Sequence, residues 1–96
     1  MIWSDPAKAD LRSIHDFIGH DSTHYAKKVT RDIVAKTDGL DELPRKGKMV
    51  PELGNEDIRE LALYSYRILY EIKALDVVVL AVIHKRRDFQ PGMIER

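Results

Sequence analysis

The feature that most constrains the fold is the segment Val77–His84, in which every residue from 77 to 83 is apolar. The run is rich in β-branched residues, and it is far shorter than the about 20 residues that span a bilayer. A short strand that is apolar on both faces is typical of the interior of a sheet. The segment is therefore predicted to be a central strand, and it leads directly into the cations Lys85–Arg87.

Two more strands are predicted to pair with this one in a meander. Residues Tyr64–Ile72 have the alternating side-chain pattern that is typical of a strand, and the link 73–76 is short enough for a hairpin. A weaker strand candidate, Ile58–Leu63, precedes them. In the middle strand one face would carry Tyr66, Ile68, Tyr70 and Ile72, and the other Arg67, Leu69 and Glu71.

The first half of the chain has helical periodicity instead. Ile2–Trp3 is a candidate edge strand, and Asp5 is predicted to cap a helix that ends at Gly19. Ser22 is predicted to cap a second helix, which continues to Leu43 before Pro44 stops it. The apolar positions of that helix are Ala26, Val29, Ile33, Leu40 and Leu43.

The predicted fold is α+β, with an N-terminal strand and an antiparallel helical hairpin on one face of a small, mostly antiparallel sheet. The chain of 96 residues is too short to divide into two stable cores, so residues 1–96 are expected to form one domain. The other sheet face has no predicted helix to cover it and is therefore expected to be open. An open face that carries apolar side chains is a candidate binding surface.

Composition excludes several classes of function. The 16 Lys and Arg balance the 16 Asp and Glu, which excludes bulk attraction to nucleic acid or membrane. The chain contains no Cys and no segment long enough to cross a bilayer, so a cytoplasmic location is expected. No Gly-rich phosphate loop or nucleophile elbow occurs, and no cofactor is predicted. A metal site at His15, His20 and His24 is not expected either, because Gly19 and Ser22 interrupt the helix there.

Two residues at the predicted sheet are candidates for chemistry. Arg67 lies in mid-strand, where it could form a cross-strand ion pair, for example with Glu60, or could present its planar fork to a phosphate. His84 ends the central strand beside Lys85–Arg87, where it could be structural or could serve as a general base. The three cations could also have no function beyond solvating the end of the strand.

The order of strand, helical hairpin and meander, taken with several short motifs, resembles the RelE/ParE toxin superfamily over nearly the whole chain. The motifs are Trp3-Ser4-Asp5-Pro6-Ala7, Asp10-Leu11, Arg59-Glu60-Leu61, Tyr66-Arg67-Ile68-Leu69-Tyr70, Val82-Ile83-His84 and Arg87-Asp88. The resemblance implies the toxin of a type II toxin–antitoxin pair. A cognate antitoxin would dock on an apolar sheet or helix surface, and operator DNA would be contacted only through that antitoxin.

The superfamily has two activities, and the resemblance implies different roles for the cations in each. RelE-type members cleave mRNA on the ribosome with several basic residues and often a C-terminal Tyr, whereas ParE-type members inhibit or poison DNA gyrase. Residues 58–63 contain no Lys, and no Tyr follows Phe89, so the gyrase activity is predicted here. The expected target-binding residues are Arg59, Arg67, Lys85, Arg86 and Arg87.

The alternative is a metal-independent, ribosome-dependent mRNA endonuclease. The resemblance would then make His84 the base, Arg67 the phosphate clamp and Arg86 a further catalytic residue. Lys46 and Lys48 would replace the missing lysines if the loop 45–55 folded over the site. A third interpretation is a non-toxic binding partner that is retained to repress its own operon.

Overall fold

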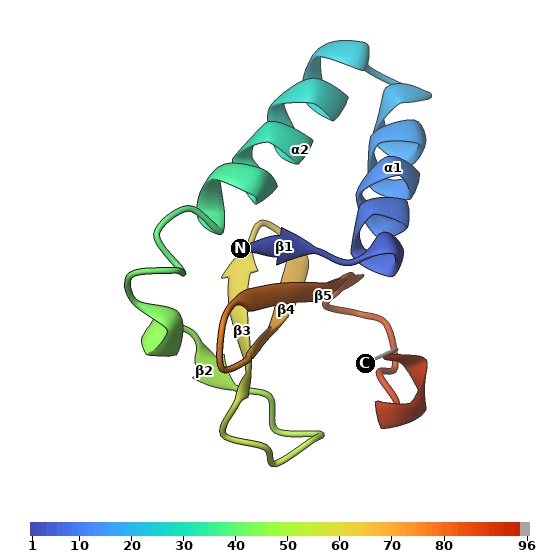
Figure 1. Cartoon of the computed structure of the whole chain (residues 1–96). Helices are drawn as coiled ribbons and strands as arrows, with labels where there is room; N and C mark the ends of the chain where they lie inside the picture. Colours follow the sequence, from blue (N-terminus) through green and yellow to red (C-terminus); the bar gives the residue numbers. More distant parts are fainter. Residues whose placement is uncertain (95–96) are drawn as a thin grey trace.

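The computed structural model describes residues 1–94 and contains two helices on one face of a five-stranded mixed sheet (Figure 1). The strand order is β1-β5-β4-β3-β2, with β1 parallel to β5 and the other neighbours antiparallel. The elements are β1 (Ile2–Trp3), α1 (Asp5–Gly19), α2 (Thr23–Lys36), β2 (Lys48–Met49), β3 (Ile58–Leu63), β4 (Tyr66–Ile72) and β5 (Val77–His84), with 3-10 turns at Pro44–Lys46 and Pro91–Met93. This arrangement confirms the predicted fold class and the interior position of the apolar strand.

Both faces of β5 are buried, and a β-bulge shifts the alternation of its side chains between them. Leu69 pairs with Ala81 and Tyr70 with Val79, so Leu80 is an extra residue in β5. On the helix side of the sheet the buried residues of β5 are Val77, Val79 and Val82. On the opposite side they are Leu80, Ala81 and Ile83.

The N-terminus of α1 is fixed to this bulge. Ser4, not Asp5 as predicted, is the N-cap, because its extended backbone lets the Ser4 Oγ accept a hydrogen bond from Ala7 N at 3.1 Å. The Ser4 backbone N donates to Val79 O at 2.9 Å. Further along α1, Asp10 Oδ2 accepts a hydrogen bond from Val82 N at 2.9 Å, and burial raises the pKa of this carboxyl.

The second helix is shorter than predicted. Ser22 caps α2 as expected, since its hydroxyl accepts a hydrogen bond from Tyr25 N at 3.2 Å. The helix ends at Lys36 rather than at Leu43, and Gly39 then takes a left-handed backbone conformation with φ of 88°. That turn directs Leu40 into the core, whereas Leu43 is left 65% exposed.

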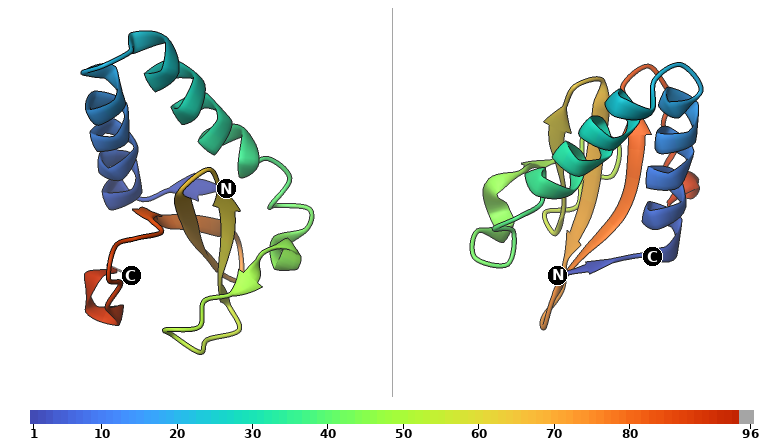
Figure 2. Two further views of the ribbon diagram at one scale, coloured as in Figure 1. Left: turned by 180° about the vertical axis from the view of Figure 1, so that it is seen from behind. Right: turned by 90° about the horizontal axis from the view of Figure 1, so that it is seen from above.

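The hydrophobic core on the helix side holds the two layers together. Viewed from above, α2 crosses over β3 and β4, while α1 runs beside β5 (Figure 2). The buried members of this core are Ala7, Ile14, Ile33, Leu40, Leu61, Ile68, Tyr70, Val77, Val79 and Val82. Neither helix in the described part of the chain is long and apolar enough to cross a membrane.

The opposite sheet face is not open, which corrects the prediction. The segment after β2 and the C-terminal tail both lie on the side of the sheet away from the helices (Figure 1). Val50 and Leu53 from the first segment, and Phe89 and Ile94 from the tail, pack against the apolar side chains of this face. Non-helical segments thus form the layer that covers this face. Such segments have no apolar periodicity from which their position could be predicted.

Candidate functional site

Arg67 lies on the face opposite the helices, where two glutamates bind its guanidinium. The Glu52 carboxylate accepts from both terminal nitrogens, Nη1 and Nη2, at 2.8 Å each. The Glu60 carboxylate accepts from Nε at 3.0 Å and from Nη2 at 2.7 Å. The cross-strand pair with Glu60 is therefore present, and in this structure the two carboxylates together occupy the guanidinium.

The surroundings of Arg67 make these ion pairs stronger than ordinary surface pairs. Its side chain is 14% exposed, that of Glu60 is 5% exposed and that of Glu52 is 32% exposed. The guanidinium also lies 5.4 Å from the centre of the Phe89 ring. The hydrogen bonds with Glu52 and Glu60 raise the pKa of Arg67, and the bonds from Arg67 hold the pKa of the Glu52 carboxyl below its usual range.

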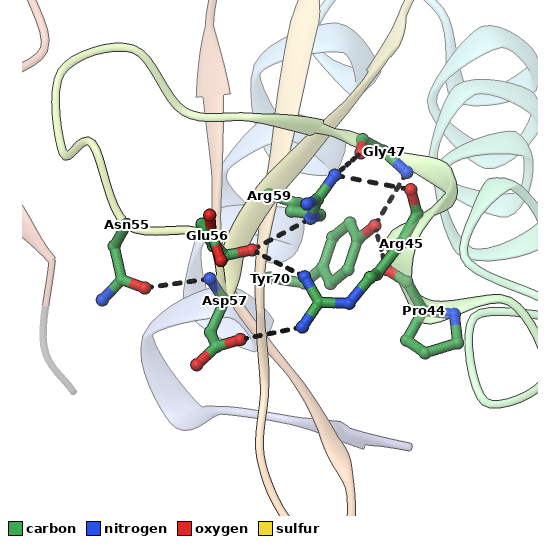
Figure 3. A network of polar contacts seen from close by, with 8 residues as sticks. All are labelled: Pro44, Arg45, Gly47, Asn55, Glu56, Asp57, Arg59 and Tyr70. Atoms are coloured by element: carbon green, nitrogen blue, oxygen red, sulfur yellow. Dashed lines mark hydrogen bonds and ion pairs between the residues drawn. The ribbon is translucent and has the colours of Figure 1, made fainter.

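Arg59, another predicted target-binding residue, is used to hold the chain segment that precedes β3 (Figure 3). Its Nε donates to Glu56 O at 3.0 Å, and its Nη1 donates to Gly47 O at 3.0 Å. Arg45 donates to the same Glu56 oxygen at 3.4 Å and to Asp57 Oδ1 at 3.2 Å. The guanidinium of Arg59 is thus occupied by backbone oxygens.

The side chain of Tyr70 lies between Arg59 and Arg45 in this arrangement (Figure 3). Its hydroxyl donates to Pro44 O at 2.6 Å and accepts from Gly47 N at 2.9 Å. We refer to the eight residues drawn in Figure 3 as the loop-anchoring network: Pro44, Arg45, Gly47, Asn55, Glu56, Asp57, Arg59 and Tyr70. The network fixes both ends of the segment between Pro44 and β3.

A shallow cavity of about 360 Å³ lies beside Arg67 on the same face. Lys48 from β2 and Lys85 from the end of β5 line it, together with Pro51, Glu52, Glu60, Ala62 and Arg67. The loop therefore does bring one of its two lysines to Arg67. Lys46 is not among the residues that line this cavity.

His84 lies on the other side of the sheet from Arg67. It pairs with Tyr66, and the two rings make an edge-on contact with centroids 5.5 Å apart. Tyr66 packs against the helix-side core, whereas Arg67, the next residue in β4, points to the opposite face. The structure thus does not bring His84 and Arg67 together around one phosphate.

The cations Lys85, Arg86 and Arg87 form an exposed turn after β5, which we call the basic turn. Lys85 N donates to Ser65 O at 2.7 Å, Arg86 N donates to His84 Nδ1 at 3.1 Å, and Arg87 N donates to His84 O at 3.0 Å. These bonds fix the backbone, and no ion pair between residues 1 and 94 engages the three side chains. Of the five predicted target-binding residues, these three are available to a partner.

A groove between α1 and α2 was not predicted from the sequence. Trp3, Leu11 and Val34 provide apolar surface in a cavity of about 600 Å³. The remaining residues that line this cavity and the adjoining one are Lys8, Arg12, His15, Lys27, Thr30 and Arg31. Among residues 1–94, four cations and no carboxylate line these two cavities, in a chain of zero net charge. The signal was the spacing of four between Lys8 and Arg12 and between Lys27 and Arg31, which places each pair on one helix face.

The described residues provide no metal-binding cluster. Between residues 1 and 94, no group of three or more His, Cys, Asp or Glu side chains is placed to hold a metal ion. The side chain of His20, one of the three histidines considered above, is 89% exposed and lies just after α1.

Comparison with known proteins gives the family. A solved structure described as "Chromosomal ParDE TA system from P. aeruginosa" matches with a TM-score of 0.71 and 24% identity, covering 85% of this chain and 90% of that chain. At this identity the likeness shows the fold. No curated protein sequence matches the chain. The family model described as "ParE toxin of type II toxin-antitoxin system, parDE" matches residues 1–89, and the chain therefore belongs to the ParE toxin family.

Proposed function

We propose that this toxin inhibits or poisons DNA gyrase in the cytoplasm, and that the basic turn contacts gyrase or its bound DNA. The observation that carries the proposal is that some of the candidate cations are bound within the chain and others are exposed. Arg59 and Arg67 are occupied within the chain, whereas Lys85, Arg86 and Arg87 are exposed on a turn whose backbone is fixed. An exposed cluster of cations on a hydrogen-bonded turn suits the binding of an acidic surface or a phosphate backbone without catalysis.

One observation favours the alternative, ribosome-dependent mRNA cleavage. Lys48 shares the cavity with Arg67 and Lys85, as a nuclease would need. Two features argue against it. The guanidinium of Arg67 is already bound by two carboxylates, and His84 lies on the other sheet face.

The gyrase proposal is tested with a DNA supercoiling assay on the purified toxin. The double variant Arg86→Gln/Arg87→Gln is expected to need at least about tenfold more protein for the same inhibition, because lost charge contacts cost about 1.4 kcal/mol or more. A matched control, Lys46→Gln/Lys73→Gln, removes two exposed cations elsewhere and should inhibit like the wild type. Unhindered gyrase beside a toxin that still stops growth would refute the proposal and direct attention to ribosome-bound mRNA. Absence of growth arrest without antitoxin would favour the non-toxic repressor.

Membership of the ParE family implies a cognate antitoxin. We propose that an acidic amphipathic segment of this antitoxin occupies the groove between α1 and α2, and that operator DNA is contacted only through the antitoxin. The apolar floor suits one face of such a segment, and the four bordering cations suit carboxylates on its flanks.

Charge reversal in the groove tests this placement. The variant Arg12→Glu/Arg31→Glu is expected to weaken antitoxin binding by tenfold or more at low salt, and by less at high salt because ions screen the contact. Isothermal titration calorimetry at two salt concentrations measures both effects. Lys46→Glu/Lys73→Glu is the control with the same change of net charge. Equal affinities for the two variants would place the antitoxin elsewhere.

A further inference from the structure

The two carboxylates that bind Arg67 differ in how firmly they are held. Glu60 belongs to β3, and its side chain is 5% exposed. Glu52 comes from the irregular segment between β2 and β3, and its side chain is 32% exposed. Glu52 nevertheless takes the bidentate position, with both of its oxygens 2.8 Å from the terminal nitrogens of the guanidinium. This is the geometry in which an arginine also binds a phosphate group.

The charges around the cavity favour an anion at this position. Lys48, Arg67 and Lys85 provide three cations, and Glu52 and Glu60 provide two carboxylates. If the Glu52 side chain turned away, three cations would face one buried carboxylate. The vacated place would then offer the two terminal guanidinium nitrogens to a ligand, in a cavity that Lys48 and Lys85 also line.

We propose that Glu52 occupies a phosphate-binding site of this protein, and that a phosphate group binds at Arg67 by displacing the Glu52 carboxylate. The site lies on the sheet face away from the helices, so it is separate from the groove between α1 and α2. The inference goes beyond the gyrase proposal and does not depend on it.

The displacement requires only rotation of one side chain. Val50 and Leu53, on either side of Glu52, are packed into the core of this face. The backbone between them is fixed by hydrogen bonds from Val50 N to Ile58 O at 3.2 Å and from Leu53 N to Val50 O at 3.1 Å. Glu52 can therefore leave Arg67 while its backbone stays in place, and its exposed side chain can be hydrated when it does so.

Binding measurements with Glu52→Ala test the proposal directly. The probes are inorganic phosphate, followed by calorimetry, and a labelled oligothymidylate without terminal phosphates, followed by fluorescence anisotropy. Removing the competing carboxylate is expected to tighten binding of at least one probe by about tenfold or more, since a hydrogen bond to a charged group contributes about 1.5–3 kcal/mol. Gain for phosphate alone indicates a free or terminal phosphate, and gain for both indicates a nucleic-acid backbone.

Two controls separate a specific site from a general change of charge. Glu56→Ala removes one exposed carboxylate from the same loop, where Glu56 contributes its backbone oxygen to the loop-anchoring network, and it should bind the probes like the wild type. Adding Arg67→Lys to Glu52→Ala keeps the charge but removes the planar fork, and it should abolish the gain. Circular dichroism verifies that each variant is folded. An equal gain for Glu56→Ala, a gain that survives Arg67→Lys, or no gain for Glu52→Ala would each overturn the proposal, and the assays contain no gyrase.

Discussion

Replacing Arg67 by methionine is expected to lower the free energy of unfolding by about 3–5 kcal/mol, because it leaves a buried charge without its partner. Glu60 would become the buried carboxylate without a partner, since its side chain is 5% exposed and both of its oxygens accept from Arg67. Glu52 can turn toward solvent and loses less. A domain of this size has a stability near the low end of about 5–15 kcal/mol, so the variant would lose much of its stability.

Urea denaturation followed by circular dichroism measures the effect of Arg67→Met. The double variant Arg67→Met/Glu60→Leu should regain most of the loss, because an apolar pair of similar volume replaces the buried ion pair. Arg45→Met is the matched control: its ion pair with Asp57 joins side chains that are 56% and 54% exposed, and its removal should cost at most about 1 kcal/mol. A loss below that of the control would show that Glu60 does not depend on Arg67.

Gly47→Ala is expected to destabilise the protein by about 1–3 kcal/mol, the range found for overpacked sites. A Cβ atom at position 47 would lie 2.6 Å from Glu60 O and 2.7 Å from the Tyr70 hydroxyl oxygen. The Glu60 oxygen cannot move away easily because Glu60 is paired with Lys48 in the sheet. Relief of the clash would also stretch the hydrogen bond from Gly47 N to the Tyr70 hydroxyl (Figure 3).

The same denaturation experiment checks this second prediction, with Gly92→Ala as its control. No atom of residues 1–94 lies within 4 Å of a Cβ at position 92, so this substitution should change stability by at most about 0.5 kcal/mol. Equal stability of the two variants would mean that the segment around Gly47 shifts without cost. The loop-anchoring network would then not be rigid, contrary to its bonding.

The secondary structure could be predicted wherever the signal was periodic and local. The helices, the three meander strands and the cap at Ser22 are all present. The errors fall at the boundaries. The end of α2 was placed seven residues too late because Leu40 and Leu43 continue the apolar spacing, and the backbone turn at Gly39 interrupts it. Tyr64 was assigned to a strand, but it takes a φ of 54° in the turn between β3 and β4.

The cations of the candidate site were predicted from the sequence. Which of them are free to bind a partner was not. Arg67 was expected either in a cross-strand ion pair or free, and only the pair with Glu60 could be proposed from the strand pattern. Glu52 is 15 residues away in a segment without periodicity, so its contact with Arg67 had no local signal. The cationic groove between the helices had a local signal in the spacing of its Lys and Arg pairs, but its existence depends on how the two helices pack.

The amino-acid sequence by itself determined which segments become helices and strands and which side chains share a face, because periodicity acts over a few neighbouring residues. The tertiary structure alone decided where the bulge in β5 falls, which segments cover the second sheet face, and which arginines are neutralised. It also placed His84 and Arg67 on opposite faces. These outcomes depend on contacts between residues far apart in the chain, and charge pairing and burial are set by such contacts and not by local pattern.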